Sequence, residues 1–334
     1  MGRLLVTLLV ATAVAPGAAN ASVSDGFDGM LVLGVAGRGD SGTPVHGERI
    51  VVADPRTGDM RARRVPGGTL CYGVPFAVGG RVLFNGNDGR RAEARWLPLT
   101  LEGAPHSLGR ADTVTPSPTP GRVWLGRWRP HGKGFQVAVR EVDLGYGDGV
   151  VAEVWRLLPR STRFEAAFEG GFATGHGARL TLWDRVLKRP LHSVPDGWLV
   201  AAGGSRIAWC AGSCRTIRIW EGDGPRTLTP PAGLHPQAGA DAAFSPDGER
   251  LALQVTDRSG ASRVAIVNLA DGGWTVVPGA RVRSYGAIAW SPLGAWVYLT
   301  AGGDRILAWA PGMARATRVP VETGGSVMSI ATAR

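Results

Sequence analysis

The sequence is poor in lysine. Lys133 and Lys188 are the two lysines among its 37 basic residues, so arginine carries almost all of the formal net charge of +10. The arginines are scattered, without the basic stripe and interleaved aromatic residues of a nucleic-acid-binding surface, so no nucleic-acid partner is expected. The charge leaves open an anionic partner from the cell envelope, such as a wall polymer or phospholipid headgroups.

Helical patterning is also missing. No stretch of four turns has apolar residues at i, i+3, i+4 and i+7, whereas alternating apolar and polar residues recur along the chain. With 50 glycines, 23 prolines and 44% hydrophobic residues, the composition is that of a turn-rich globular protein and not of a disordered one. The sequence therefore predicts an all-β fold.

Long hydrophobic runs are absent beyond the first residues. The run from Leu4 to Ala15 is shorter than the roughly 20 residues that a membrane-crossing helix needs. It follows a short basic start and precedes Ala19-Asn20-Ala21, a small-x-small cleavage pattern, which predicts a secretory signal peptide over residues 1–21. We expect residues 22–334 to form one secreted or extracytoplasmic domain that has no transmembrane segment and is a monomer.

One hairpin pattern occurs twice. "FSPDGERLAL" (Phe244–Leu253) and "WSPLGAWVYL" (Trp290–Leu299) each contain an aromatic residue, Ser-Pro, one variable position and Gly before an alternating apolar run. Proline fixes φ at the second residue of such a turn, and glycine adopts backbone angles that other residues avoid. Both stretches therefore predict a strand, a tight turn and a second strand.

A second kind of hairpin recurs along the whole chain as a strand, a turn containing Gly or Asp, and a polar strand that ends in Pro or Gly. Its copies begin at Arg49, Arg91, Val137, Arg179, Arg215, Ser262 and Arg305, those at Arg91 and Val137 being weaker. Another hairpin precedes each copy, so each unit contains four short strands of about 44 residues in total, the length of a propeller blade. The sequence predicts a seven-bladed β-propeller of four-stranded antiparallel blades, since radial stacking covers both apolar faces of each sheet.

The repeats "AAFSPDGERLAL" and "AIAWSPLGAWVYL" resemble those of TolB-like and WD-repeat-like propellers of secreted bacterial proteins. The likeness is clear over roughly residues 238–322 and fades to strand rhythm in the N-terminal half. It implies a propeller fold and, commonly, a role in protein binding or scaffolding. It implies no particular chemistry, because these propellers have many functions.

By strand count, one strand is left over at the C-terminus and one strand is missing from the first unit. The seventh unit ends near Glu322, which leaves Ser326 to Ala333 over, and the first unit, beginning at Gly29, lacks an inner strand. We expect Ser326–Ala333 to complete blade one as its inner strand, with alternate residues facing opposite sides.

Cysteine is scarce, at three residues. Cys210 and Cys214 flank a three-residue loop between two expected neighbouring strands, where Cα atoms come within reach of a disulfide. An oxidising compartment favours that bond, and free thiols or a functional pair are the alternatives. Cys71, in an apolar run, is expected to be a buried free thiol.

Catalytic and metal-binding motifs are not evident. "GDSGTP" (Gly39–Pro44) has no histidine before its serine, as a trypsin-like protease would require, and the six histidines form no zinc motif. The stretch Asp143–Gly149 lacks the closing glutamate of a calcium loop. Carboxylates available for a glycosidase pair lie mostly in turn contexts: Asp241, Asp247, Asp257, Asp271 and Asp304. No metal and no cofactor is expected.

Tryptophan is abundant, with 12 residues. For several of them core packing is expected, because they lie at strand positions where blade faces meet. An exposed row that stacks sugars is the alternative. These residues are Trp124, Trp128, Trp155, Trp209, Trp220, Trp290 and Trp309.

The predicted function is a non-catalytic binding or scaffolding module whose site lies at the mouth of the central channel. The candidates are residues that precede blades six and seven: His235, Gln237, Arg281, Arg283 and Tyr285. Arginine and tyrosine together suit an acidic or peptide ligand, so the partner is an unknown protein, a peptide or an anionic envelope component. The alternative is a cell-envelope enzyme, such as a glycan-cleaving propeller.

Overall fold

The computed structural model describes residues 26–36, 49–65, 75–87, 92–132, 134–145, 149–159, 162–221, 224–282 and 286–334. The expected signal peptide and its cleavage site lie outside the described residues, as do Cys71, Gly39–Pro44 and two site candidates, Arg283 and Tyr285. Among the described residues, no helix is long and apolar enough to cross a membrane.

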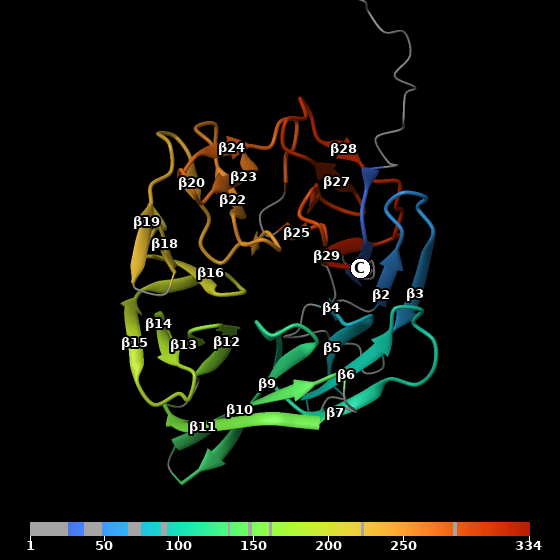
Figure 1. The fold of residues 1–334 in the computed structure, drawn as a ribbon. Helices are drawn as coiled ribbons and strands as arrows, with labels where there is room; N and C mark the ends of the chain where they lie inside the picture. Colours follow the sequence, from blue (N-terminus) through green and yellow to red (C-terminus); the bar gives the residue numbers. More distant parts are fainter. Residues whose placement is uncertain are drawn as a thin grey trace, which may run out of the picture.

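The described strands form seven sheets arranged around a ring (Figure 1). Every pairing within a sheet is antiparallel, and the order below runs from the inner strand outward. Blade one contains β29 (Ser326–Ala333), β1 (Met30–Ala36), β2 (Arg49–Ala53) and β3 (Met60–Arg64). Blade two contains β4 (Phe76–Val78), β5 (Arg81–Asn87), β6 (Ala92–Pro98) and β7 (His106–Arg110). Blade three contains β8 (Thr113–Pro116), β9 (Arg122–His131), β10 (Gly134–Asp143) and β11 (Gly149–Leu158).

The second half of the chain continues the same arrangement. Blade four contains β12 (Arg163–Phe168), β13 (Gly171–His176), β14 (Arg179–Asp184) and β15 (Pro190–Pro195). Blade five contains β16 (Gly197–Gly203), β17 (Arg206–Ala211), β18 (Ile217–Trp220) and β19 (Pro225–Leu228). Blade six has a divided inner strand, β20 (His235–Pro236) and β21 (Ala242–Phe244), followed by β22 (Arg250–Thr256), β23 (Ser262–Asn268) and β24 (Trp274–Val276). Blade seven contains β25 (Ile288–Trp290), β26 (Val297–Thr300), β27 (Ile306–Trp309) and β28 (Thr317–Arg318).

The predicted architecture is confirmed. Each of the seven recurring hairpins found in the sequence forms the third and fourth strands of one blade, beginning with β2–β3 and ending with β27–β28. Seven clusters of buried apolar residues lie between successive blades, one at each interface. A blade therefore buries both of its faces only when it has a neighbour on each side, which is why the unit repeats until the ring closes.

The two Ser-Pro-x-Gly stretches form the predicted turns between a first and a second strand. The amide of Gly248 donates to the carbonyl of Ser245, and Gly294 donates likewise to Ser291, each over 2.8 Å. Both glycines have positive φ, 73° and 74°, which a residue with a side chain adopts only under strain. Arg250, which begins the strand after the first turn, donates to the carbonyl of Gly294 and so links the two hairpins.

The ring closes through the C-terminal strand, as predicted. β29 pairs with β1 from Met30 opposite Ala333 to Ala36 opposite Ser326. The expected strict alternation of β29 is wrong, because the register shifts by one residue at Met328, which is exposed as the extra residue of a bulge. Val327 and Ile330 are both buried on the two sides of this irregularity.

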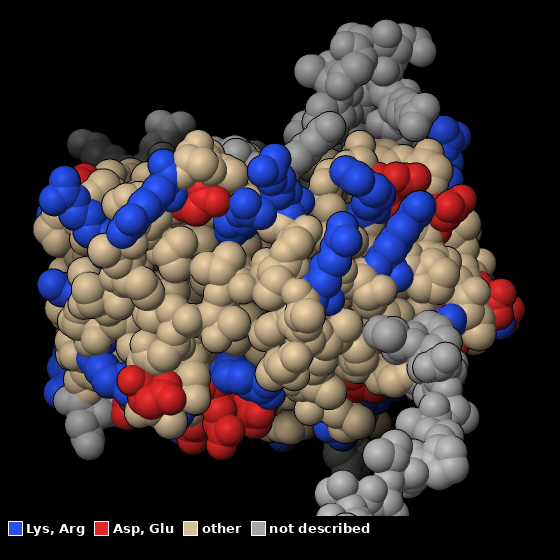
Figure 2. Space-filling view, turned by 90° about the horizontal axis from the view of Figure 1, so that it is seen from above, with Lys and Arg blue, Asp and Glu red and all other residues tan. Residues whose placement is uncertain are grey.

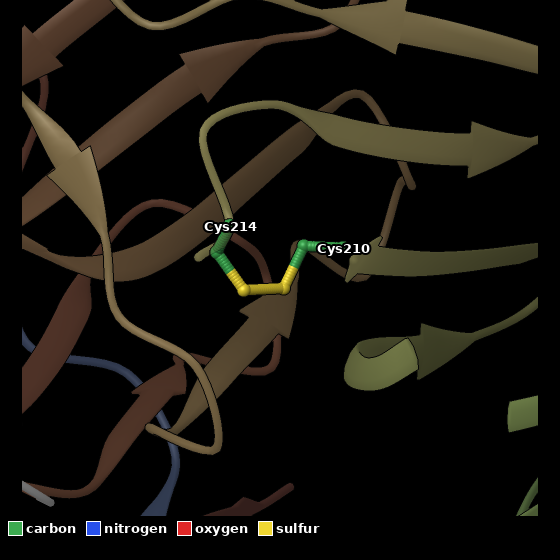
Figure 3. Close-up of a disulfide and its surroundings, with 2 residues drawn as sticks. All are labelled: Cys210 and Cys214. Carbon is green, nitrogen blue, oxygen red and sulfur yellow. A yellow bond between two sulfur atoms is a disulfide. The ribbon is translucent and has the colours of Figure 1, made fainter. Parts of the chain in front are cut away.

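Cys210 and Cys214 form the predicted disulfide, at a Cα–Cα distance of 4.9 Å (Figure 3). Cys210 lies near the end of β17, and the chain turns back at Cys214 before β18 begins. Both residues are buried in the apolar cluster between blades five and six. The disulfide therefore fastens a tight turn inside a blade interface.

The expectation for the tryptophans is met in part. Trp124, Trp209, Trp290 and Trp309 are buried between blades, as core packing requires. Trp155 is the exception, because 62% of it is exposed. It lies on β11, where Glu153, Trp155 and Leu157 are all exposed, so this face of the strand meets solvent instead of a neighbouring blade.

Candidate functional site

The inner strands of blades four, five and six share an irregularity. On β12 the register shifts at Glu165, and on β16 it shifts at Val200. In blade six, residues 237–241 separate β20 from β21, although both strands pair with β22. A bulge bends its strand and redirects the extra side chain, and bulges are common beside binding sites.

These irregular segments surround one cavity of about 340 Å³. We call it the axial cavity. It lies on the face of the ring where the inner strands begin. Because neighbouring strands are antiparallel, the turn from β13 to β14 lies on the same face. Its lining includes Arg163, Glu165, Arg179, Trp198, Val200 and Asp241.

Glu165 lines the axial cavity, and its carboxylate lies beside Gly175 of the neighbouring strand β13. A Cβ at Gly175, on β13, would lie 2.5 Å from its Oε1 atom, so glycine at that position leaves room for the carboxylate. Burial raises the pKa of Glu165, and the positive charge of Arg163 partly offsets this. The Nε atom of Arg163 lies 3.3 Å from Oε1, so this carboxylate has a cationic partner within the chain.

Asp241 has no such partner. It makes no hydrogen bond or ion pair with any residue that the structure describes, and it lies at the end of the loop of residues 237–241. The residue is accessible to solvent, but protein from three blades surrounds it, and the reduced hydration raises its pKa to about 6. An unpaired carboxylate in such surroundings is stabilised by any cation that approaches it.

Trp198 supplies an aromatic surface beside these carboxylates. It lies near the start of β16 and is 43% exposed, in contrast to the buried tryptophans between blades. A Cβ at Gly239 would lie 3.9 Å from its ring, and Gly239 has a positive φ of 68°. The positive φ favours glycine at this turn, while the space beside the ring would also admit a small side chain.

Three of the residues predicted from sequence to form the site, His235, Gln237 and Arg281, are described by the structure and do not line the axial cavity. His235 begins β20 and is exposed, while Arg281 is exposed between blades six and seven. The side-chain amide of Gln237 donates to the hydroxyls of Thr256 and Ser262, over 2.8 and 2.9 Å, which holds it within blade six. Their role in ligand binding stays a prediction.

Sequence reasoning placed Asp241 among the available carboxylates but missed Glu165 and Trp198. One signal for Glu165 was present, because it is the acidic residue within the otherwise apolar end of "RFEAAF", an inner strand. Three other aspartates, Asp247, Asp257 and Asp271, accept hydrogen bonds from backbone amides two residues further on, as their turn contexts indicated.

A larger cavity, of about 480 Å³, lies on the opposite face between blades three, four and five. Its carboxylates have partners within the chain. Glu141 accepts a hydrogen bond from Ser117 over 2.5 Å, and Glu169 lies 3.7 Å from a guanidinium nitrogen of Arg185. The axial cavity is the better candidate because it contains a carboxylate that the chain leaves unpaired.

No metal site is evident in the part of the chain that the structure describes. There, no group of three or more His, Cys, Asp or Glu residues is arranged to hold a metal ion. Figure 2 views the ring from its upper side in Figure 1, and on this side the basic residues are spread over the surface with acidic residues among them. Asp143, in the stretch compared with a calcium loop, is paired with Arg122 over 3.0 Å.

The architecture defines the chain as a seven-bladed β-propeller with a TolB-like fold. No model of a protein family matches the sequence, and no curated protein matches it. Among solved structures, TolB from Acinetobacter baumannii is similar, with 12% identity and a TM-score of 0.50 over 91% of this chain and 67% of that one.

A peptidase and a domain of a protease are similar as well. The acylaminoacyl peptidase of Pyrococcus horikoshii has 11% identity and a TM-score of 0.56 over 83% of this chain, which spans 48% of that protein. The β-propeller domain of the Trilobed protease from Pyrococcus furiosus has the same identity and TM-score over 81% of this chain and 89% of that one. That domain is described as having an open velcro topology, whereas here β29 pairs with β1. At these identities the likeness concerns the fold.

Proposed function

We propose that this protein is an extracytoplasmic binding module that performs no catalysis and binds a cationic group in the axial cavity. The observation that carries the proposal is Asp241, which no described residue pairs with, placed with Glu165 and the exposed ring of Trp198 by bulges in blades four and five and by the divided inner strand of blade six. A positive group between carboxylates and an indole ring gains ion pairing and a cation–π contact together. Arginine or lysine side chains of a partner protein have this chemistry.

The absence of catalysis is proposed from the way the carboxylates are held. A general acid or base works best when hydrogen bonds fix its orientation, and no described residue makes one to Asp241. Glu165 is neutralised in part by Arg163. This arrangement suits attraction of a charge more than transfer of a proton.

The extracytoplasmic location is supported by the disulfide between Cys210 and Cys214, because such bonds persist in oxidising compartments. The signal peptide over residues 1–21 and the monomeric state stay predictions. An acidic ligand bound through Arg281, Arg283 and Tyr285 also stays a prediction.

Calorimetric titration with the N-acetylated and C-amidated peptide Gly-Arg-Gly tests the proposal, and the same blocked peptide with citrulline in place of arginine is the neutral control. We expect the arginine peptide to bind more tightly at pH 8 than at pH 5, because Asp241 is ionised only above its pKa of about 6. Asp241→Asn should weaken binding roughly 10-fold, in line with the loss of one charge-assisted hydrogen bond.

Asp304→Asn, outside the axial cavity, is the matched control and should leave the affinity unchanged. Equal binding of the arginine and citrulline peptides, or an Asp241→Asn variant that binds as well as the unaltered protein, would contradict the proposal.

A glycan-cleaving enzyme is the second candidate, since two carboxylates line one cavity and the pKa of Asp241, about 6, suits a general acid. Release of reducing ends from cell-wall glycan would distinguish it. Hydrolysis that Asp241→Asn and Glu165→Gln each abolish would favour the enzyme over the binding module.

A further inference from the structure

The outer strand of blade three differs from the outer strands of the other blades. β11 is 10 residues long, has no proline, and lies along the outer edge of the ring with no strand beyond it (Figure 1). The other outer strands are short, carry several arginines or begin with proline, features that protect an edge from pairing with other chains: β3, β7, β15, β19, β24 and β28. β11 lacks these protections.

Large apolar side chains are exposed along β11. Trp155 is 62% exposed and Leu157 is 53% exposed, and Val150 and Val151 are exposed near the start of the strand. Trp155 and Leu157 share one face of the sheet because they are two residues apart. An exposed apolar row beside unpaired backbone groups is the arrangement to which an added strand binds.

The opposite face of β11 is held firmly against blade four. Ala152 and Val154 pack on the apolar cluster that contains Trp183, and the guanidinium of Arg156 lies 4.3 Å from the centre of the Trp183 ring. Arg156 also donates to the carbonyl of Leu187 over 2.5 Å. β11 is therefore a fixed edge, so a partner strand would meet it preformed.

The exposed face of β11 also carries one charge. Glu153 shares this face with Trp155 and Leu157, is exposed, and forms no ion pair with a described residue. Arg140 lies directly across from it on β10, but its guanidinium donates to the carbonyl of Leu108 over 2.7 Å. A strand added beside β11 would thus meet two apolar side chains followed by a free carboxylate.

A second copy of this chain does not complement that pattern. Antiparallel pairing of two β11 strands about a two-fold axis puts residues of the same face opposite one another. If the two-fold axis passes at Glu153, the two Glu153 carboxylates lie opposite one another. If it passes at Val154, Glu153 of one copy lies opposite Trp155 of the other. If it passes at Trp155, Glu153 lies opposite Leu157. None of these three registers places a cation opposite Glu153.

We propose that β11 is a docking edge for an extended segment of another polypeptide, which adds an antiparallel strand beside it. On the face of Trp155, the segment presents two apolar residues opposite Leu157 and Trp155 and a lysine or arginine opposite Glu153. Backbone hydrogen bonds to the open edge supply affinity, and the three side-chain pairs set the register.

The peptide STVTVTKTS has this pattern when it runs antiparallel to β11, and STVTVTETS is its charge-reversed control. Fluorescence polarisation with labelled peptides should show that the unaltered protein prefers the lysine peptide by about 5-fold, the effect expected of one cross-strand charge pair. Hydrogen exchange should slow in residues 149–158 when the lysine peptide is bound, and not in β24.

Glu153→Lys should reverse the preference in favour of the glutamate peptide, while Glu322→Lys, an exposed control near the outer strand of blade seven, should leave it unchanged. Equal affinity for both peptides, or no saturable binding up to about 1 mM, overturns the proposal. The proposal is also overturned if the protein sediments as a dimer and the Trp155→Lys variant sediments as a monomer, because a second copy of the chain then occupies the edge.

Discussion

The backbone amide of Gly34 donates a hydrogen bond to the side-chain hydroxyl of Ser329 over 3.1 Å, at a buried position where β1 meets β29. The bond lies at the bulge of β29, where the regular ladder is interrupted. A side chain thus supplies an acceptor to a backbone group at the irregularity. The two residues are 295 positions apart in the sequence, so this contact belongs to ring closure.

Ser329→Ala should destabilise the protein by about 1–3 kcal/mol, because it leaves the buried amide of Gly34 without an acceptor. Urea unfolding followed by circular dichroism measures this change. Ser326→Ala, on the same strand but without that bond, is the control. Equal unfolding free energies for the two variants would show that the hydroxyl has no such role.

Removal of residues 326–334 should lower stability far more than trimming a flexible tail. Val327 and Ile330 are buried in the ring, and loss of these two side chains alone corresponds to about 3–6 kcal/mol. The truncation also opens one edge of β1. Thermal unfolding measures the effect, with deletion of the exposed Arg334 alone as the control; an unchanged melting temperature would mean that β29 is dispensable.

Replacing Cys210 and Cys214 together by serine should reduce stability by about 2 kcal/mol from chain entropy, with a further loss because the sites are buried. In the unaltered protein, mass analysis after alkylation without reductant should find both of these thiols protected. Alkylation of all three cysteines under those conditions would contradict the disulfide.

Asp241→Asn should stabilise the protein above pH 6 and have little effect below pH 4. The pKa of Asp241 is about 6 in the folded protein and 3.8 ordinarily, so the folded state binds more protons between these values. Stability of the unaltered protein therefore rises as pH falls through this window. Melting temperatures of both proteins at pH 8 and pH 4 test this. If the two proteins differ in melting temperature by the same amount at both pH values, titration of Asp241 does not contribute to the stability.

The fold was predictable because its determinants are local. Alternating apolar runs set the strands, and glycines such as Gly248 and Gly294 set the tight turns, so the hairpins and their number follow from the sequence. The exposure of Trp155 was not predictable in this way. Its strand alternates like one between two blades, and whether a neighbour covers it depends on the lengths of strands in another blade.

The candidate site was predictable only in its approximate position. Glu165, Trp198 and Asp241 belong to three different blades, and no spacing along the chain shows that they line one cavity. Bulges place these segments, and a bulge depends on how the partner strand accommodates one extra residue. Of the candidates chosen from the sequence, Gln237 is held within blade six by its hydrogen bonds to Thr256 and Ser262.

Pairing of β29 with β1 also imposes an order on biosynthesis. The first sheet lacks its innermost member until the ribosome has made all the other blades, so β1 has one unprotected edge throughout elongation. Contacts between such distant segments make folding slow. The first blade of the nascent chain thus remains incomplete until residues 326–333 emerge.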